Sequence, residues 1–418
     1  MIDALLARFD IDANVAQAAA RAVARVDGST RVRAASVVHA NVLRAFFDEG
    51  VAESDLAGSL GYGYDDAARA RYESLLARIF GAERALARLS LVSGTHAIVT
   101  ALAACLPRDG KLLVATGRPY DTLRNAIVDA PHSLVRRGAR YDEVPFRDDG
   151  DIDFDALTVA CERGVDVVFV QRSRGYAPRR SLRAAECGDI ARAVRAVAPH
   201  AFVLVDNCYG ELVEATEPTH HGVDAVMGSL IKNLGGGLAP GGGYIVGRAD
   251  VVERAAAHHY APGLGSAVGP TLGFGRALIQ GLFYAPVVVG ECLAGLDLAA
   301  ALFAELGWPV HPRPGEARCD IVQAIELGSA RRLVAFARGL QRAMPLNARC
   351  APEPGAVPGY PDPVIMSGGA FVPGATIELS CDAPLRSPFE VYLQGGTSRE
   401  HVLLGALMAA ESLQKESN

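Results

Sequence analysis

The chain has 418 residues and a net charge of −6, with 50% hydrophobic and 21% charged residues. This length exceeds what one hydrophobic core usually organises, so we expect at least two domains. The acidic balance argues against nucleic-acid binding, and we expect no membrane span, because no window reaches the roughly 18 apolar residues that one needs. The eight cysteines are scattered without a CxxC pair, which argues against a metal site and indicates a cytoplasmic protein with reduced thiols.

The amino-terminal residues 1–57 are rich in Ala and Arg and predict amphipathic helices. A turn of glycine and tyrosine, GSLGYGYDD (58–66), follows them, and helical and extended patterns alternate after it. The predicted helices cover 71–83, 93–106 and 183–197, and the predicted strands cover 84–92, 111–116, 165–173 and 201–207. Short apolar strands that alternate with helices are typical of a parallel sheet in an α/β fold.

The last third of the chain has a different pattern. A long Ala- and Leu-rich helix is predicted at 286–306 and a strand at 375–382. A closing helix is predicted at 397–414, with Thr397 or Ser398 as its N-cap.

These patterns predict the domain organisation. We expect a large domain with a mainly parallel sheet over residues 58–285, and a smaller α+β domain over 286–418. The helical segment 1–57 precedes both.

Three short stretches carry candidate chemistry, and the first is LVSGTHAIVTAL (91–102). An extended segment leads through Ser93, Gly94 and Thr95 directly into a helix. The free backbone N–H groups of such a helix start, with the hydroxyls of Ser93 and Thr95, would form an anion site. An ordinary capped helix explains the same residues.

The second stretch is AFVLVDNCYGE (201–211), in which Asp206 lies at the carboxyl end of a predicted strand. Open α/β sheets hold their ligands at this edge. A carboxylate there would pair with a cationic ring nitrogen or a metal, or it would only cap the next helix.

The third stretch is GSLIKNLGGGLAPGGGYIVG (228–247), in which Lys232 precedes two glycine triplets. A lysine that is partly removed from water has a lowered pKa and is nucleophilic, whereas a surface lysine is the ordinary alternative. The glycines follow the lysine, which excludes a Walker-type phosphate loop, and no G-x-G-x-x-G turn links a strand to a helix here. The triplets instead allow the chain to fold closely around something bound to Lys232.

Together, the three stretches meet the needs of pyridoxal phosphate. This cofactor requires a helix start for its phosphate, an acid beside its pyridinium nitrogen and a lysine for a Schiff base. Tyr120, in VATGRPYDTL (114–123), follows the next predicted strand and offers an aromatic face to the ring. The sequence therefore predicts Lys232 as the reactive lysine and Asp206 as the acid.

Longer motifs show a family resemblance. SGTHA, GRPYDTL, QRSRGY, VDNCYGE, GSLIKN and PDPVIMSGGAFVPGATIELSCDAPLR together resemble the methionine γ-lyase-related family, over about residues 58–408. Its members are often called aluminium-resistance proteins, and it is more distantly similar to the cystathionine lyases. The resemblance implies an α/β fold of the PLP-dependent transferase type I, the cofactor pyridoxal 5′-phosphate, and a lyase that acts on a small amino-acid substrate.

The resemblance also implies roles for individual residues. Lys232 would form the Schiff base, Asp206 would pair with the ring nitrogen, and Tyr120 would stack on the ring. The residues that would hold the phosphate are Ser93, Gly94, Thr95 and Ser229. Tyr62 or Tyr64 would be donated across a subunit interface, so we expect a homodimer or homotetramer with shared active sites.

Several stretches depart from the family pattern. GYGYDD (61–66) lacks the arginine that cystathionine lyases carry beside the interface tyrosine, and APRR (177–180) stands where relatives read S-W-R-P. Leu234 replaces a proline, and HHYAPGLGSAVGP (258–270) also differs. The cofactor residues are intact, and the departures concern the substrate pocket.

The expected reaction is elimination at Cβ or Cγ, or replacement at Cγ, on a methionine- or cystathionine-like substrate. Elimination would give a 2-oxo acid, ammonia and a thiol. Two alternatives stay open: a non-sulfur leaving group, such as the halide of a γ-halo amino acid that becomes an unsaturated or alkynyl amino acid, and a PLP-binding protein with a regulatory or metal-tolerance role. Arg386 is expected to bind the substrate carboxylate through two parallel hydrogen bonds, with Arg172 and Arg174 as rivals.

Overall fold

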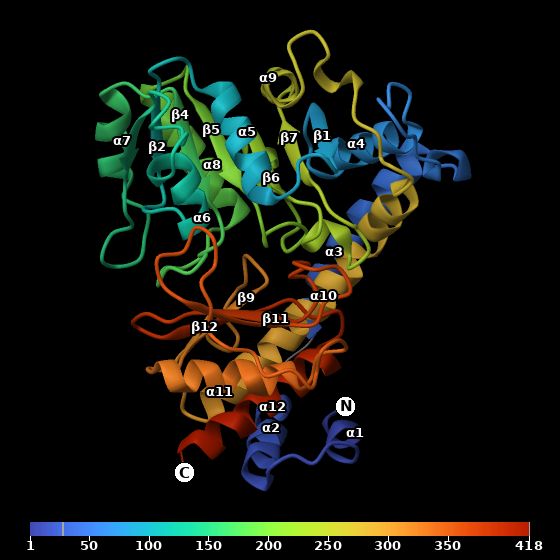
Figure 1. Cartoon of the computed structure of the whole chain (residues 1–418), viewed down its shortest axis with the longest axis vertical. Helices are drawn as coiled ribbons and strands as arrows, with labels where there is room; N and C mark the ends of the chain where they lie inside the picture. Colours follow the sequence, from blue (N-terminus) through green and yellow to red (C-terminus); the bar gives the residue numbers. More distant parts are fainter. Residues whose placement is uncertain (27–28, 418) are drawn as a thin grey trace. The chain divides into compact units, whose positions relative to one another are not determined.

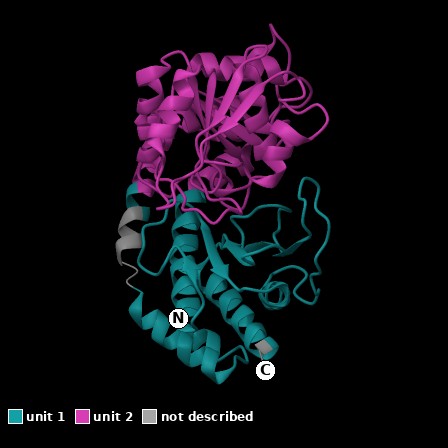
Figure 2. Cartoon of the chain, turned by 90° about the vertical axis from the view of Figure 1, so that its left-hand side faces the viewer, with its two compact units in different colours: residues 1–37, 284–418 teal, residues 38–283 magenta. Residues whose placement is uncertain are grey.

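The computed structural model describes residues 1–26 and 29–417. The chain divides into two compact units (Figure 2): unit 1 comprises Met1–Val37 and Tyr284–Asn418, and unit 2 comprises Val38–Phe283. Both junctions lie inside helices, α3 (Ser29–Glu49) and α10 (Gly275–Glu305). The first 37 residues thus group with the carboxyl-terminal part of the chain, whereas residues 1–57 are predicted as a separate helical segment.

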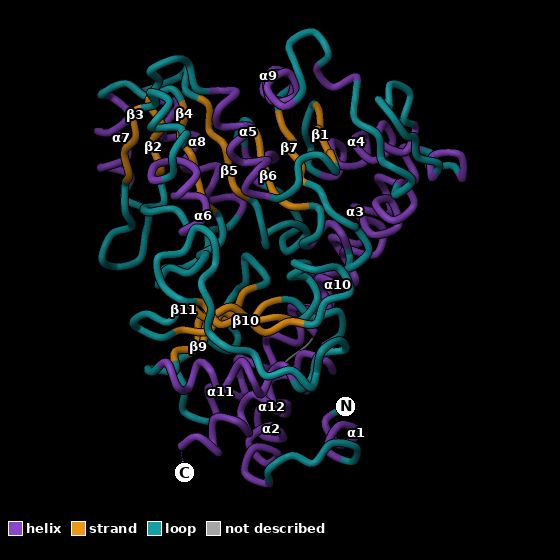
Figure 3. The backbone as a smooth tube through the Cα atoms, in the orientation of Figure 1, coloured by secondary structure: helices purple, strands orange, loops and turns teal. Residues whose placement is uncertain are grey.

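Unit 2 contains a seven-stranded sheet in the order β1-β7-β6-β5-β4-β2-β3 (Figures 1 and 3). β7 runs antiparallel to β1 and β6, and the other neighbouring strands are parallel. The strands are β1 (Arg84–Arg88), β2 (Lys111–Val114), β3 (Arg140–Glu143), β4 (Val167–Gln171), β5 (Phe202–Asp206), β6 (Ala225–Ser229) and β7 (Gly243–Gly247). The mainly parallel sheet confirms the predicted α/β fold class.

Helices alternate with these strands. The α-helices are α4 (Ala67–Ile79), α5 (Gly94–Cys105), α6 (Asp121–Arg124), α7 (Phe154–Glu162), α8 (Ala184–Val197) and α9 (Ala249–His259). The shorter or irregular helical turns are η1 (Glu53–Leu56), η2 (Asn125–Asp129), η3 (Pro218–His221), η4 (Asn233–Gly235) and η5 (Gly265–Ala267). The predicted strand at 84–92 is shorter in the structure, because the chain turns after Arg88 to reach the start of α5.

The core of unit 2 positions the ends of the central strands. Phe169, Leu204 and Met227 pack with apolar residues of α5 and α9 on one face of the sheet. Because strand side chains alternate between the two faces, the residues two positions later point to the same face. These residues are Gln171, Asp206 and Ser229, and each ends its strand.

Unit 1 contains a five-stranded antiparallel sheet in the order β10-β11-β12-β9-β8. Its strands are β8 (Val310–His311), β9 (Val322–Glu326), β10 (Val364–Gly368), β11 (Ser380–Pro384) and β12 (Glu390–Gln394). Its helices, besides parts of α3 and α10, are α1 (Ile2–Leu6), α2 (Ala13–Arg25), α11 (Ala330–Gln341) and α12 (Arg399–Ser417). The helix and sheet content agrees with the predicted smaller α+β domain.

Three predicted elements of unit 1 have different bounds. The predicted strand at 375–382 begins only at Ser380, because Glu378 donates its backbone N–H to the Ala375 carbonyl at 3.0 Å in a turn. The predicted helix at 286–306 begins earlier and contains Pro286 in its interior. The closing helix is capped by Ser398, whose Oγ accepts the backbone N–H of His401 at 3.2 Å.

Helix α10 is apolar over a long stretch. It contains an 18-residue window with a mean hydropathy of 1.9, which is long and apolar enough to cross a membrane by composition alone. This corrects the expectation that no such window exists. However, 72% of the window is buried inside the protein, as in the core helix of a globular domain.

Candidate active site

The amino-terminal end of α5 lies against the ends of two central strands. Ser93 is the N-cap, and its Oγ accepts the backbone N–H of His96 at 3.1 Å. The N–H groups of Gly94 and Thr95, in the first turn, have no acceptor within the helix. A side chain on Gly94 would place its Cβ 3.0 Å from Cys208 Sγ and 3.4 Å from Ser229 Cβ, so a larger residue here would crowd both neighbours.

Asp206 lies at the carboxyl edge of the sheet, as predicted. It pairs in register with Gln171 of β4 and Met227 of β6. Its side chain is buried, and Oδ1 accepts the backbone N–H of Cys208 at 3.0 Å. Burial raises the pKa of Asp206 above its ordinary value, while the nearby Lys232 charge and the Cys208 hydrogen bond oppose that rise.

Tyr120 links the start of α5 to the end of β4. Its hydroxyl lies 3.1 Å from Thr95 Oγ1, and its backbone N–H donates to Gln171 Oε1 at 3.1 Å. Burial and the Asp206 charge hold the pKa of the Tyr120 phenol well above its ordinary value, so the phenol stays protonated at neutral pH. The structure therefore brings Tyr120, Thr95 and the strand ends together.

Lys232 follows β6 and begins the turn η4. Its Nζ lies 3.7 Å from the centre of the Tyr209 ring, and no hydrogen bond of this amine is found among residues 1–26 and 29–417. Burial by itself lowers the pKa of Lys232. The acidic groups around the amine more than offset this effect and raise the pKa above its ordinary value; in order of decreasing effect they are Cys208, Tyr209, Asp206 and Tyr120.

The backbone conformation of the segment after Lys232 depends on glycine. Gly236 and Gly242 have φ angles of +53° and +105°, which residues with a Cβ rarely adopt. Asn233 is fully buried and donates through Nδ2 to the carbonyl oxygens of Tyr209 and Glu211, at 3.1 and 2.8 Å. The glycines and Asn233 thus fix the turn that carries the amine.

Other predicted residues do not gather at this edge of the sheet. Tyr62 and Tyr64 are 78% and 57% exposed, and their ring centres lie 6.0 Å apart. Their loop is held by the buried Arg69, which donates to the carbonyl oxygens of Gly63, Gly269 and Ala267. Two exposed aromatic rings thus stand on a well-anchored loop.

The three candidate arginines differ strongly. Arg172 is fully buried, and its guanidinium donates to Asn207 Oδ1 at 2.6 Å, to Glu214 Oε2 at 2.5 Å and to backbone carbonyls. This burial and pairing argue against Arg172 as a substrate anchor. Arg174 is also buried, with Nε donating to the Ala177 carbonyl at 3.1 Å. Arg386 lies in unit 1, and its Nη1 lies 3.4 Å from Asp362 Oδ2.

Four residues at this edge were missed from the sequence. Gln171 supports Tyr120, Tyr209 lies under the Lys232 amine, and Asn233 and Glu211 complete the surroundings. The signal for three of them was local: VDNCYGE places an aromatic residue and an acid within five residues of Asp206, and K-N places an amide directly after Lys232.

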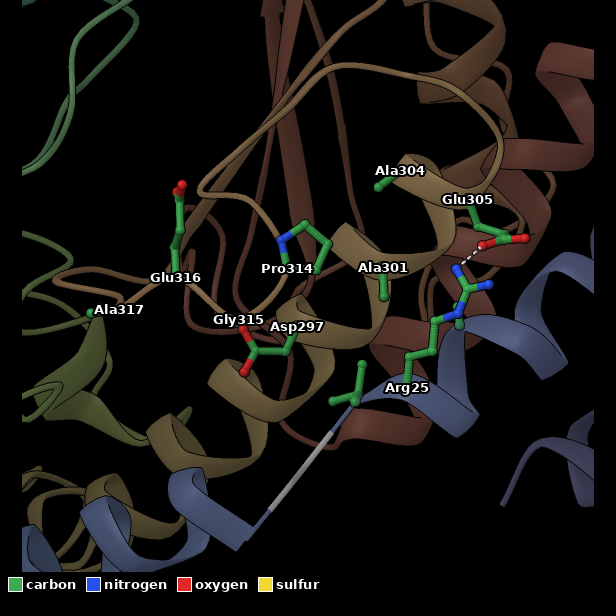
Figure 4. A pocket seen from close by; sticks show the side chains of 11 residues that line it. Arg25, Asp297, Ala301, Ala304, Glu305, Pro314, Gly315, Glu316 and Ala317 are labelled. Atoms are coloured by element: carbon green, nitrogen blue, oxygen red, sulfur yellow. Dashed lines mark hydrogen bonds and ion pairs between the residues drawn. The ribbon is translucent and has the colours of Figure 1, made fainter.

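Two further features of the described part of the chain lie outside this set. No group of three or more His, Cys, Asp or Glu side chains that could hold a metal ion is found there. A cavity of about 620 Å³ in unit 1 is lined by residues of α2, α10 and the 314–317 loop, and the Arg25–Glu305 ion pair of 2.5 Å lies at its side (Figure 4). None of the predicted site residues lines it.

Comparison with known proteins assigns the family. The model of the family described as methionine gamma-lyase matches residues 13–414. This chain belongs to the methionine gamma-lyase family. The uncharacterized protein YnbB of Bacillus subtilis is 40% identical over 379 residues, which are 90% of each chain.

Solved structures of similar proteins agree. A candidate cystathionine beta-lyase involved in aluminium resistance from Clostridium acetobutylicum is 38% identical, with a TM-score of 0.94 over 98% of both chains. A carbon-sulfur lyase involved in aluminium resistance from Clostridium novyi NT is 34% identical, with a TM-score of 0.92 over 98% of both chains. These findings confirm the resemblance, the type I fold of PLP-dependent enzymes and a PLP-dependent lyase.

The cofactor of this methionine gamma-lyase family member is pyridoxal 5′-phosphate, and the described residues fit it. Backbone N–H groups at the start of α5 and the buried Ser229 hydroxyl offer donors for a phosphate. Because Gly94 has no side chain, the start of α5 lies close to Ser229. A carboxylate, an aromatic ring and a buried amine, those of Asp206, Tyr120 and Lys232, surround the same edge of the sheet.

Proposed function

We propose that this lyase removes the β or γ substituent of a methionine- or cystathionine-like amino acid, by elimination or γ-replacement. The observation that carries the proposal is the half-buried Lys232 amine, which faces acidic groups and the Tyr209 ring without a hydrogen bond among the described residues. Such an amine is placed to react rather than to hold the fold together. The solved relative from Clostridium novyi NT, described as a carbon-sulfur lyase, supports the reaction class.

Different residues of the site would bind different parts of the cofactor. The start of α5, Ser93 to Thr95, and the Ser229 hydroxyl would bind the phosphate. Asp206 would keep a proton on the ring nitrogen, and Tyr120 would pack against the ring. When bound, pyridoxal phosphate draws electrons from the substrate α-carbon and makes its proton acidic.

The remaining chemistry would belong to side chains of this chain. Lys232 would hold the cofactor covalently and, once the substrate frees its amine, take the proton from the α-carbon and return a proton during elimination. Arg386 would bind the substrate carboxylate and fix which bond at the α-carbon breaks.

Assembly and location form part of the proposal. The exposed rings of Tyr62 and Tyr64 on a rigid loop would complete the site of a second copy, in a homodimer or homotetramer with shared active sites. The eight cysteines are free, and most are buried, which suits the reducing cytoplasm. Sedimentation of the purified enzyme checks the assembly, and a fully active monomer would contradict it.

A substrate screen tests the reaction. The purified enzyme, loaded with pyridoxal phosphate, is incubated with methionine, cystathionine, homocysteine and a γ-halo amino acid, and 2-oxo acid, ammonia and the leaving group are measured. We expect release of 2-oxo acid and a thiol from a sulfur substrate, and none with the Lys232→Met variant. Turnover of the halo amino acid alone points to a halide leaving group, and no turnover with any substrate supports a regulatory role.

A further inference from the structure

The segment that follows β5 has an unusual backbone. Tyr209 has a φ of +72° and Leu212 has a φ of +59°. Residues with a Cβ rarely adopt this left-handed conformation, because Cβ crowds the neighbouring carbonyl oxygen. Such conformations persist only where surrounding contacts impose them, and they gather at functional sites.

Hydrogen bonds hold Tyr209 in this conformation from both sides. Asn233 Nδ2 bonds the carbonyl oxygens of Tyr209 and Glu211 at 3.1 and 2.8 Å. The next residue, Gly210, donates its N–H to the Asn207 carbonyl at 2.9 Å, and its own carbonyl accepts from Arg172 Nη1 at 3.0 Å. The backbone around Tyr209 is therefore fixed.

This conformation determines where the Tyr209 ring lies. Lys232 precedes Asn233 in the chain, so the residue that binds the Tyr209 carbonyl belongs to the turn that carries the amine. The ring centre lies 3.7 Å from Lys232 Nζ, well inside the distance at which an ammonium is attracted to an aromatic face. The strained backbone thus places a ring face directly against the amine.

Titratable groups of two segments face Lys232. They are Tyr120, directly before α6, and the groups at and after the end of β5, which are Asp206, Cys208, Tyr209 and Glu211. Burial raises the pKa of the Cys208 thiol well above its ordinary value and the pKa of the Glu211 carboxyl to about 8. Both groups are therefore protonated at neutral pH. Asp206 is left as the main source of negative charge near the amine, and the Tyr209 ring is the group in contact with it.

We propose that Tyr209 is a positioning residue, whose ring face receives the free amine of Lys232 and favours its protonated form. The inference rests on the proposed function, in which Lys232 moves a proton and its amine must therefore be free during part of each turnover. An aromatic face attracts an ammonium more strongly than a neutral amine. The ring consequently holds the proton on Lys232 and keeps the amine at the site while it is detached.

The test compares three variants in cofactor-free protein. Tyr209→Phe keeps the ring, Tyr209→Leu removes the ring but keeps the Cβ that strains the backbone, and Tyr209→Gly removes both. The measured quantity is the rate at which saturating pyridoxal phosphate becomes covalently attached, followed by absorbance at a pH below the midpoint of the rate profile. Only the neutral amine attacks, so the rate follows its fraction.

We expect the Leu and Gly variants to attach the cofactor about 3- to 30-fold faster than the wild type, and the rate profile to move to lower pH by about 0.4 to 1.5 units. The Phe variant should match the wild type. Equal or slower attachment in the Leu and Gly variants, or a change in the Gly variant alone, would overturn the proposal, because the ring would then not act on the amine. Should the Leu variant fold poorly, Tyr209→Ala, which also removes the ring and keeps the Cβ, takes its place with Phe as control.

The Lys232→Met variant separates this inference from the proposed function. If that variant still attaches the cofactor covalently, Lys232 is not the reactive amine and the proposed function fails. If it does not, while the Tyr209 variants behave like the wild type, the function stands and only the role of Tyr209 fails.

Discussion

The segment 206–217 contacts two cations in opposite ways: Arg172 is fully buried and Lys232 is half-buried. On one side, Arg172 is bound by Asn207, Glu214 and backbone carbonyls, and Glu217 lies 3.5 Å from its Nη1. On the other side, Lys232 has the Tyr209 ring at 3.7 Å and no hydrogen bond among the described residues. The acids of the segment follow the same division.

The two acids show the contrast in detail. Glu217 accepts from Asn207 Nδ2 at 2.9 Å and from the Leu212 N–H at 2.8 Å. Glu211 accepts from the Tyr244 hydroxyl at 2.7 Å, and its Oε2 has no partner among the described residues. A guanidinium with hydrogen bonds on several sides fixes the chain, whereas a half-buried amine that contacts a ring and makes no hydrogen bond among the described residues is available for chemistry. The hydrogen-bonded contacts around Arg172 therefore fix the segment that also contacts the reactive Lys232.

The largest expected effect on stability comes from breaking the bonded side. Arg172→Met should lower the free energy of unfolding by about 3–5 kcal/mol, because it leaves the carboxylate of Glu217 buried without its cation. Denaturant unfolding measures this loss. Arg180→Met is the control: Arg180 is 39% exposed in its ion pairs with Asp151 and Glu186, and we expect a change below about 1 kcal/mol. Equal effects of the two substitutions would contradict the contrast.

A third cation, Arg386, tests whether the substrate is held by an arginine of unit 1. Its side chain is 33% exposed and pairs with Asp362 at 3.4 Å. Arg386→Lys should leave the absorbance of the bound cofactor unchanged and lower kcat/KM, by an amount that corresponds to about 2–5 kcal/mol of lost transition-state stabilisation. The reason is that lysine cannot make two parallel hydrogen bonds to a carboxylate. Steady-state kinetics measure it, with Arg338→Lys as control.

Near-normal turnover of the Arg386 variant would rule it out as the anchor. The substrate carboxylate would then be assigned to Arg174, since the structure argues against Arg172.

The smallest expected effect concerns the sparsely bonded side. Tyr244→Phe removes the hydrogen bond to Glu211 and should cost about 1 kcal/mol in the free energy of unfolding. Tyr72→Phe is the matched control, because the buried Tyr72 hydroxyl has no partner among the described residues and its removal should be neutral or stabilising. A larger loss in Tyr72→Phe than in Tyr244→Phe would show that the described bonding is incomplete.

The sequence predicts those parts of the site that depend on local patterns. The helix start at Ser93, the acid at the end of β5 and the lysine after β6 each follow from a short motif, and the structure places all three at one edge of the sheet. The parallel order of the strands makes this edge common to them. The α/β fold class was predictable from the same patterns, whereas the type I fold was implied only by the family resemblance.

The parts that depend on contacts distant in the sequence were not predictable. The position of the Tyr209 ring requires a left-handed backbone, and that requires the Asn233 amide from another segment. The burial of Arg172 depends on Glu214 and Glu217, which nothing in the QRSRGY motif reveals. The strand predicted at 375–382 was shortened by a turn that its apolar residues conceal.

The central claim is that Lys232 is the reactive amine of this enzyme, and borohydride reduction tests it most directly. The purified protein, loaded with pyridoxal phosphate, is reduced, digested and analysed by mass spectrometry, with the Lys232→Met variant treated in parallel. We predict a yellow protein in which the peptide containing Lys232 alone carries one reduced pyridoxyl group, and a variant without the group. A colourless protein that does not take up the cofactor, or a pyridoxyl group on another lysine, would contradict the account.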